Sequence, residues 1–159
     1  MILTKNYTGL EEQGNNFYLP SDLEVNDDLK IDLAGTLLVE GCVKVAGDIY
    51  FRNSNSLCSL YVDDEIQVGG SVMVEGRLQS GGSIEVGKAL SVGTSLLSSG
   101  HVQIGGDMNV ERDVNVHSYL SVNGLIDCGG ALDVGGWIAF RKKLLARKGI
   151  SAWYITLKK

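Results

Sequence analysis

Apolar and polar residues alternate along most of the chain in a repeating unit of six residues. From residue 66 to residue 155 this unit recurs 15 times without an insertion, as in IQVGGS, VMVEGR and LQSGGS. We label its positions a to f. Position a is always Ile, Val, Leu or Met, c is mostly Val, b is mostly polar, and d to f are rich in Gly, Ser and charged residues. Alternation over three residues, followed by a glycine-rich bend, predicts a short strand and a turn.

Units this short cannot bury their apolar residues alone, so they must stack on one another. Three units close one triangular coil of about 18 residues, and each strand pairs in parallel with the strand one coil above. The predicted fold is therefore all-β, a single-stranded triangular parallel β-helix (a β-solenoid) of about seven coils. Side chains at a and c point inward, because successive strand residues alternate faces. The spacing does not determine the handedness of the coil.

The hexads become weaker and interrupted toward the N-terminus. The predicted organisation is an N-terminal cap segment over 1–22, a solenoid domain over 23–155 and a basic tail over 156–159. The longest interruption predicts a corner loop at 52–59. Each segment outside the repeat is too short to form a domain of its own.

The open strand edges at the two ends of a solenoid need shielding. At the N-terminal end, Phe17 and Tyr18 lie in a segment without the hexad pattern, and we expect this segment to fold irregularly over the first coil. At the C-terminal end, Trp153 and Tyr154 are the candidates for closing the last coil, unless another molecule covers it.

The net charge of −5 hides a strong asymmetry along the chain. Residues 138–159 contain 7 of the 14 basic residues and none of the 19 acidic ones. Most of these cations fall at predicted corner positions of the last coil, namely Arg141, Lys142, Lys143, Arg147 and Lys148. An amphipathic helix over 141–149 is the competing interpretation, but the unbroken phase of six favours a strand. We expect this basic end to associate with an acidic surface on another molecule.

One outward column of corner residues is rich in large side chains. Its later members are His101, Tyr119, Trp137 and Ile155, each 18 residues after the one before. Large aromatic side chains at exposed corners are candidates for contact with a partner. The alternative is that they cover a neighbouring corner of the same molecule.

The sequence contains no constellation that indicates catalysis, a metal site or a cofactor. Two histidines, His101 and His117, do not complete a zinc site, which needs three or four ligands. The Gly-Gly pairs open no helix and lack the Gly-Lys-Ser/Thr ending of a phosphate loop, so they are corners. The first residues include Glu11 and Glu12 and no long apolar run, and the three cysteines are an odd number. We therefore expect a cytoplasmic protein without a disulfide framework or membrane insertion.

The recurring V-x-V-x-G of IQVGGSVMVEG and LKIDLAGTLLVEGCVKVAGDI resembles the bactofilins, which are polymer-forming bacterial cytoskeletal β-solenoids. It is also similar to glycine-punctuated β-helical segments of phage fibres. The bactofilin resemblance covers roughly residues 23–155 and implies end-to-end polymerisation without nucleotide. The hexapeptide-repeat acyltransferases share the period, but their catalytic histidine loop and cofactor extensions have no counterpart here.

These observations favour a non-enzymatic scaffold that self-associates or binds another protein. The alternative is a small acidic inhibitor or adaptor, of the kind that mobile elements encode against host defence, which blocks a nucleic-acid groove on its target. Its acidic columns would include Asp22, Asp27, Asp28 and Asp32. An acyltransferase-like enzyme ranks third. We expect no small-molecule substrate, and contact with nucleic acid only through the basic C-terminal end.

Overall fold

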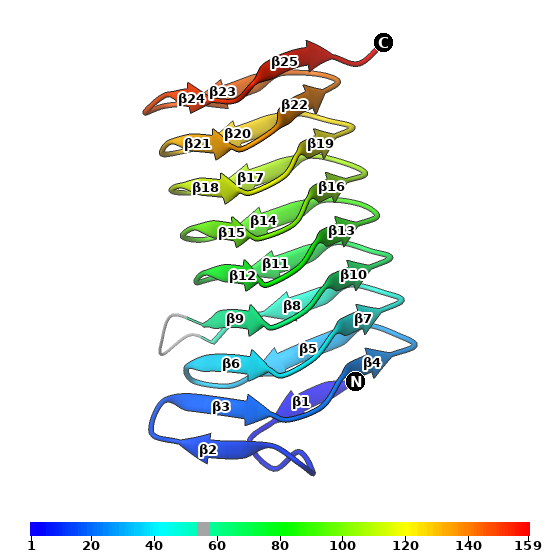
Figure 1. Ribbon diagram of the computed structural model, residues 1–159. Helices are drawn as coiled ribbons and strands as arrows, with labels where there is room; N and C mark the ends of the chain where they lie inside the picture. Colours follow the sequence, from blue (N-terminus) through cyan, green and yellow to red (C-terminus); the bar gives the residue numbers. More distant parts are fainter. Residues whose placement is uncertain (54–57) are drawn as a thin grey trace.

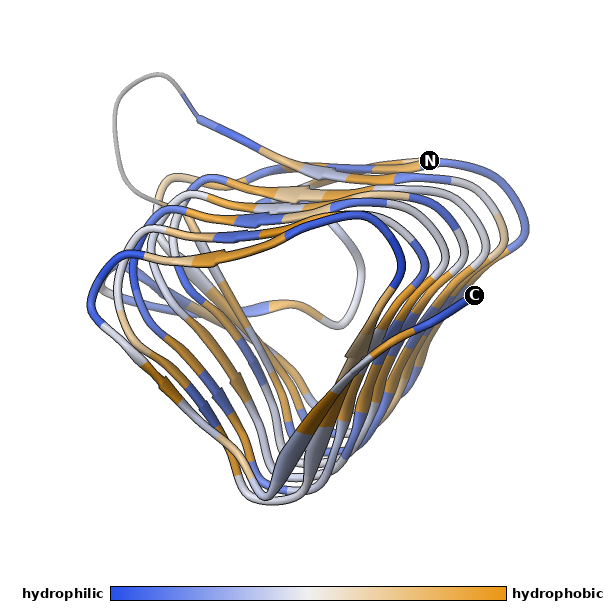
Figure 2. Cartoon of the chain, turned by 90° about the horizontal axis from the view of Figure 1, so that it is seen from above, coloured by the Kyte–Doolittle hydropathy of each residue, from blue (hydrophilic) through white to orange (hydrophobic). Residues whose placement is uncertain are grey.

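The computed structural model describes residues 1–53 and 58–159, and these form 25 β-strands. The described residues include no helix, and hence none that could cross a membrane. The strands wrap around one axis and stack into three sheets that enclose a triangular core (Figures 1 and 2). The predicted triangular β-solenoid is confirmed.

Each side of the triangle is one sheet. Sheet A contains β1 (Ile2–Thr4), β5 (Leu29–Asp32), β8 (Ile49–Phe51), β11 (Val72–Val74), β14 (Leu90–Val92), β17 (Met108–Val110), β20 (Ile126–Cys128) and β23 (Leu144–Ala146). Sheet B contains β2 (Glu11–Gln13), β3 (Asn16–Leu19), β6 (Thr36–Val39), β9 (Ser59–Val62), β12 (Leu78–Ser80), β15 (Leu96–Ser98), β18 (Val114–Val116), β21 (Leu132–Val134) and β24 (Ile150–Ser151). Sheet C contains β4 (Leu23–Val25), β7 (Val43–Val45), β10 (Ile66–Val68), β13 (Ile84–Val86), β16 (Val102–Ile104), β19 (Leu120–Val122), β22 (Trp137–Phe140) and β25 (Tyr154–Leu157).

Within the uninterrupted repeat, residues 18 apart pair in parallel. Ile66 pairs with Ile84 in sheet C, and Val72 pairs with Leu90 in sheet A. The inward positions a and c are buried from Ile66 to Ile138, as at Val110, which is 1% exposed. The predicted register and the inward face of each strand are therefore confirmed.

The coil is right-handed, a point that the sequence left open. In Figure 1 the strands of sheets B and C run from left to right in front, and those of sheet A run from right to left behind, while the chain rises toward its C-terminus. Sheets A and C contain eight strands each, so the solenoid has about eight turns rather than seven. The additional turn arises because β1 and β3, in the predicted cap segment, join sheets A and B.

Two serines occupy inward c positions of sheet B. The Ser80 hydroxyl donates to the carbonyl oxygen of Asp64 at 2.6 Å, and the Ser98 hydroxyl donates to that of Gly82 at 2.9 Å. Both serines are 1% exposed, and a buried hydroxyl without a partner would destabilise the fold. The main chain of the preceding coil therefore satisfies these hydroxyls.

Glycines at the corners allow consecutive coils to approach closely. Among the described residues only Gly9, Gly14, Gly35 and Gly149 have a positive φ, so the other corner glycines do not serve that purpose. At Gly105 a Cβ would collide with the carbonyl oxygen of the glycine one coil below. Glycine is needed there because another backbone passes at that point.

The N-terminal segment is regular, contrary to the expectation of an irregular cap. Strand β1 pairs with β5, β3 pairs with β6, and β2 folds back antiparallel on β3. Phe17 is buried in this first turn, whereas Tyr18 is half-exposed because it falls on the outward face of β3. Tyr7 and Leu10, in the loop between β1 and β2, pack against the core from below. They close this end of the solenoid.

The last turn of the solenoid is formed by strands, as predicted, but it is one residue shorter than the turns before it. Strand β23 confirms a strand rather than a helix within 141–149. Ile150 pairs with Leu132 in the expected register, but Ile155 then pairs with Ile138 rather than following Trp137. Part of the predicted basic tail is consequently the end of β25.

The predicted corner loop at 52–59 contains residues 54–57, which lie outside the described residues. On one side of it, Arg52 forms an ion pair with Glu75 at 3.0 Å. Proximity to the Tyr50 hydroxyl and to this carboxylate raises the pKa of Arg52. On the other side, Cys58 is buried.

Candidate functional site

Short polar side chains at position f connect consecutive corners. The Asp113 carboxylate accepts the backbone N–H of Ala131 at 2.9 Å, and Asp48 accepts that of Ser71 at 2.7 Å. Asp22 and Asp28 have the same role toward the coil above them. Several acids that could form an acidic binding surface therefore satisfy main-chain donors of the solenoid.

The corner between sheets B and C carries a column of stacked rings. The His101 and Tyr119 rings lie 4.7 Å apart between centroids and 2° from parallel. The next pair, Tyr119 and Trp137, lies at 4.4 Å and 6°. The structure thus brings together three of the four predicted members of the corner column.

The fourth ring of the column is Tyr154 rather than the predicted Ile155. It lies 6.4 Å from the Trp137 ring, because the shortened last turn brings it into register with Trp137. Ile155 occupies an inward position instead. The sequence contains a signal for this shift, since Ile155-Thr156-Leu157 repeats the a-b-c alternation one residue early.

At its lower end the column is held by hydrogen bonds around His101. Its Nδ1 lies 3.0 Å from the Ser83 hydroxyl, one coil below, and its Nε2 lies 3.3 Å from Glu85 Oε1. All three side chains are half-exposed. Above them, the Gln103 amide donates to the Tyr119 hydroxyl at 2.8 Å. The sequence analysis missed this set, because its members come from successive coils.

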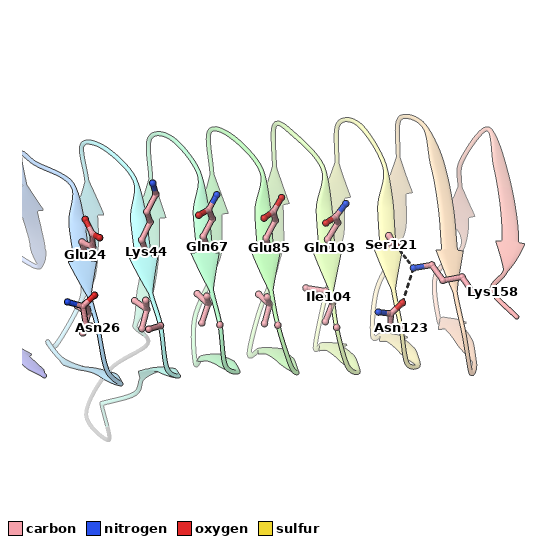
Figure 3. A pocket seen from close by; sticks show the side chains of 18 residues that line it. Glu24, Asn26, Lys44, Gln67, Glu85, Gln103, Ile104, Ser121, Asn123 and Lys158 are labelled. Atoms are coloured by element: carbon pink, nitrogen blue, oxygen red, sulfur yellow. Dashed lines mark hydrogen bonds between the residues drawn. The ribbon is translucent and has the colours of Figure 1, made fainter.

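A groove of about 770 Å³ runs beside the column along the outer face of sheet C. One wall is the row of outward b side chains seen in Figure 3, from Glu24 through Glu85 to Ser121. Small d residues such as Gly87 and Gly105 line it as well. At its C-terminal end the Lys158 ammonium donates to Ser121 and Asn123 (Figure 3).

The C-terminal end of the solenoid exposes apolar side chains. At the inward positions of the last turn, Ile150, Ile155 and Leu157 are 41%, 46% and 57% exposed, whereas the equivalent positions of inner coils are buried. Trp153, at the preceding corner, is 86% exposed. No described strand pairs with the outer edges of β23, β24 and β25. This end therefore presents both apolar area and free main-chain groups.

Cations surround this apolar end. The predicted basic residues are all exposed, namely Arg141, Lys142, Lys143, Arg147 and Lys148. Of these, Arg147 forms an ion pair with Asp127 at 3.0 Å, the one ion pair that this set makes within the described chain. The remaining charges lie free at the corners.

The opposite end differs in shape and polarity. Tyr7 and Leu10 cover its core, and β2 occupies the edge of sheet B with Glu11, Glu12 and Gln13 exposed. Here the large apolar side chains left exposed are Met1 and Ile2. The C-terminal end is consequently the larger apolar surface of the two.

No group of three or more His, Cys, Asp or Glu residues that could hold a metal ion occurs in the described ranges. His117 is exposed at the d position of the corner that carries Tyr119. The pKa of the Cys128 thiol is raised, mainly because the thiol is buried. The thiol donates to the carbonyl oxygen of Arg112 at 3.1 Å. This cysteine is a packing residue rather than a reactive thiol.

Comparison with known proteins identified no matching family model, curated protein or solved structure. The structure therefore shows a parallel β-solenoid, and the resemblance to bactofilins rests on the sequence repeat alone.

Proposed function

We propose that this protein is a structural protein, a β-solenoid rod that associates with a second copy through its C-terminal end. The observation that carries the proposal is the open last turn. Three of its inward residues, Ile150, Ile155 and Leu157, are exposed at positions that are buried in the inner coils, and its strand edges have no partner within the described chain. Exposed apolar area beside unpaired edges is typical of an association surface.

A second C-terminal end is the occupant that fits this surface best. In a two-fold arrangement the edge of β25 would pair antiparallel with its copy, and the apolar residues of the two last turns would face each other. The N-terminal end is a poorer partner, because β2 lies where an added strand of sheet B would have to pair. This favours end-to-end contact between like ends over the basic-to-acidic contact expected from the charges.

The corner cations oppose this contact, since each end carries several of them. They lie at the periphery of the triangle, where solvent and salt screen them. Exposed charges contribute little per pair, whereas each buried Leu or Ile side chain stabilises by about 1.5–3 kcal/mol. We therefore expect the burial of apolar side chains to outweigh the repulsion between the cations. The repulsion should lower the affinity of the dimer and disfavour other alignments of the two ends.

The test is the mass in solution of the double variant Ile155→Asp, Leu157→Asp. We expect the wild type to form dimers that dissociate on dilution, and this variant to remain monomeric in light scattering after size exclusion. Met73→Asp is the matched control, because Met73 is 40% exposed on the side of the rod. It should leave the dimer intact.

A wild type that stays monomeric at every concentration would rule the proposal out. Loss of the dimer in both variants would show that the C-terminal end is not the contact. Melting temperatures close to wild type in both variants would confirm that the comparison concerns association and not folding.

The hexad repeat and the proposed self-association are similar to what the resemblance to bactofilins implies, namely end-to-end polymerisation. A dimer through one end alone gives a rod of twice the length. Growth into filaments would need a second contact, at the N-terminal end or along the sides.

A further inference from the structure

A hydroxyl, an imidazole and a carboxylate lie in series at the lower end of the stacked rings. Glu85 is an acceptor, so the His101 Nε2 that faces it carries the ring proton. His101 Nδ1 is then an acceptor, and the Ser83 hydroxyl donates to it across 3.0 Å. An imidazole nitrogen that accepts from a hydroxyl, while a carboxylate holds the second ring nitrogen, is the arrangement that activates a serine nucleophile.

We propose that Ser83 is a nucleophile that accepts acyl groups from small activated esters, with His101 as its base and Glu85 as a positioning residue. The site lies on the side of the rod, and it does not depend on association through the C-terminal end.

Other corner serines show what a purely structural serine does at this position of the repeat. Ser59 and Ser71 occupy equivalent f positions, and their hydroxyl oxygens accept a backbone N–H from the coil above at 3.0 and 3.3 Å. Ser83 makes the same contact at 3.3 Å with the N–H of His101. At Ser59 and Ser71 the hydrogen bond between coils forms without an imidazole. Ser83 differs from them because a base lies within hydrogen-bond distance of its hydroxyl.

The surroundings hold the base in place and leave the hydroxyl accessible. The Tyr119 ring lies parallel to the imidazole at 4.7 Å and restricts its rotation. Ser83 itself is half-exposed, and the proposed reaction requires that a small acyl donor approach its oxygen from solvent. Glu85 also lines the groove on sheet C, so its carboxylate borders both His101 and that groove.

The acyl transfer balances with the groups present and water. Ser83 Oγ attacks the ester carbonyl carbon, and its proton passes to His101 Nδ1. The alkoxide or phenoxide leaves with that proton, and an acyl-serine ester forms. Water then attacks this ester with Nδ1 again as base, which releases the carboxylic acid and restores the hydroxyl.

The experiment uses the full chain and p-nitrophenyl acetate as the probe. Peptide mass mapping should find an acetyl group on Ser83, and stopped samples should give its rate of formation. His101→Phe removes the base but keeps a ring against Tyr119, so the fold should persist. We expect this variant to slow acetylation of Ser83 at least roughly 100-fold, the typical contribution of a positioned base. Ser71→Ala is the matched control and should leave that rate unchanged.

The role of Glu85 has a separate readout. In the wild type, long-range nitrogen–proton NMR correlation should find the imidazole proton of His101 on Nε2, and Glu85→Gln should change that signal and slow acetylation. If Ser83 is not acetylated, if it is acetylated no faster than Ser71, or if His101→Phe leaves its rate unchanged, the proposal is wrong.

Discussion

Each inward side chain of the solenoid packs against its equivalents one coil above and one coil below. Val110, for example, lies between Val92 and Cys128 in the ladder of sheet A. A change at one such position therefore disturbs three coils. Outward residues of the same strands, such as Asn109, face solvent and lack this coupling.

Val110→Asp should unfold the central coils. The substitution places a carboxylate without a partner at a site that is 1% exposed, at a cost of roughly 4 kcal/mol or more. The free energy of unfolding, measured with urea and circular dichroism, checks this. Ser91→Asp adds the same charge on the outward side of the neighbouring strand β14, between Met73 and Asn109, and should change it little. An unaltered stability of Val110→Asp would contradict the assigned inward face.

At the scale of elements, the unit is a strand of three or four residues and a tight corner. The strands are too short to be stable individually, and the corners therefore continue the hydrogen bonding between coils. Gly105 N–H, for instance, donates to the Val86 carbonyl at 2.8 Å. A larger side chain at a corner should therefore destabilise the rod where the backbones of consecutive coils approach each other.

Gly105→Ala should destabilise the rod by about 1–3 kcal/mol, as an overpacked site does, because the new Cβ meets the carbonyl oxygen of Gly87. Glu111→Ala is the control at a d position that already carries a side chain and is exposed. Thermal denaturation of both variants checks the comparison. Equal melting temperatures would show that the corner can move apart at little cost.

At the scale of the whole molecule, the two ends of the rod are unlike. The N-terminal end is closed by Tyr7, Leu10 and an antiparallel strand, whereas the C-terminal end is apolar and basic. The proposed contact through the C-terminal end favours a closed dimer over an open polymer, because a two-fold contact uses that end in both copies.

Salt should distinguish the two possible contacts. Contact between two basic ends should strengthen as sodium chloride screens their repulsion, whereas contact between a basic and an acidic end should weaken. Sedimentation equilibrium across a salt series gives the dissociation constant. The variant Lys142→Glu, Lys148→Glu should bind itself more tightly at low salt, because it lowers the positive charge of both ends. Weaker binding of this variant would favour the head-to-tail contact instead.

The sequence by itself determined the solenoid, its triangular coil and the residues of its core. This was possible because the hexad repeats without insertion from residue 66 to residue 155. Over that range the local alternation predicts the inward face of each strand, and the constant spacing predicts which strands pair. Val110, Ser80 and Ser98 lie inward as their positions in the repeat predict. The three-membered ring column, His101 with Tyr119 and Trp137, follows from the same 18-residue spacing.

Only the tertiary structure decided the features that depend on the geometry between coils. The hand of the coil is not encoded in a spacing that either hand can satisfy. Tyr154 replaces Ile155 in the column because the last corner closes with one residue fewer, which places Ile155 and Leu157 inward. The series from Ser83 through His101 to Glu85 depends on the orientation of one ring between two coils. A repeat specifies which residues stack on one another, but their side-chain contacts arise only when the coils are stacked.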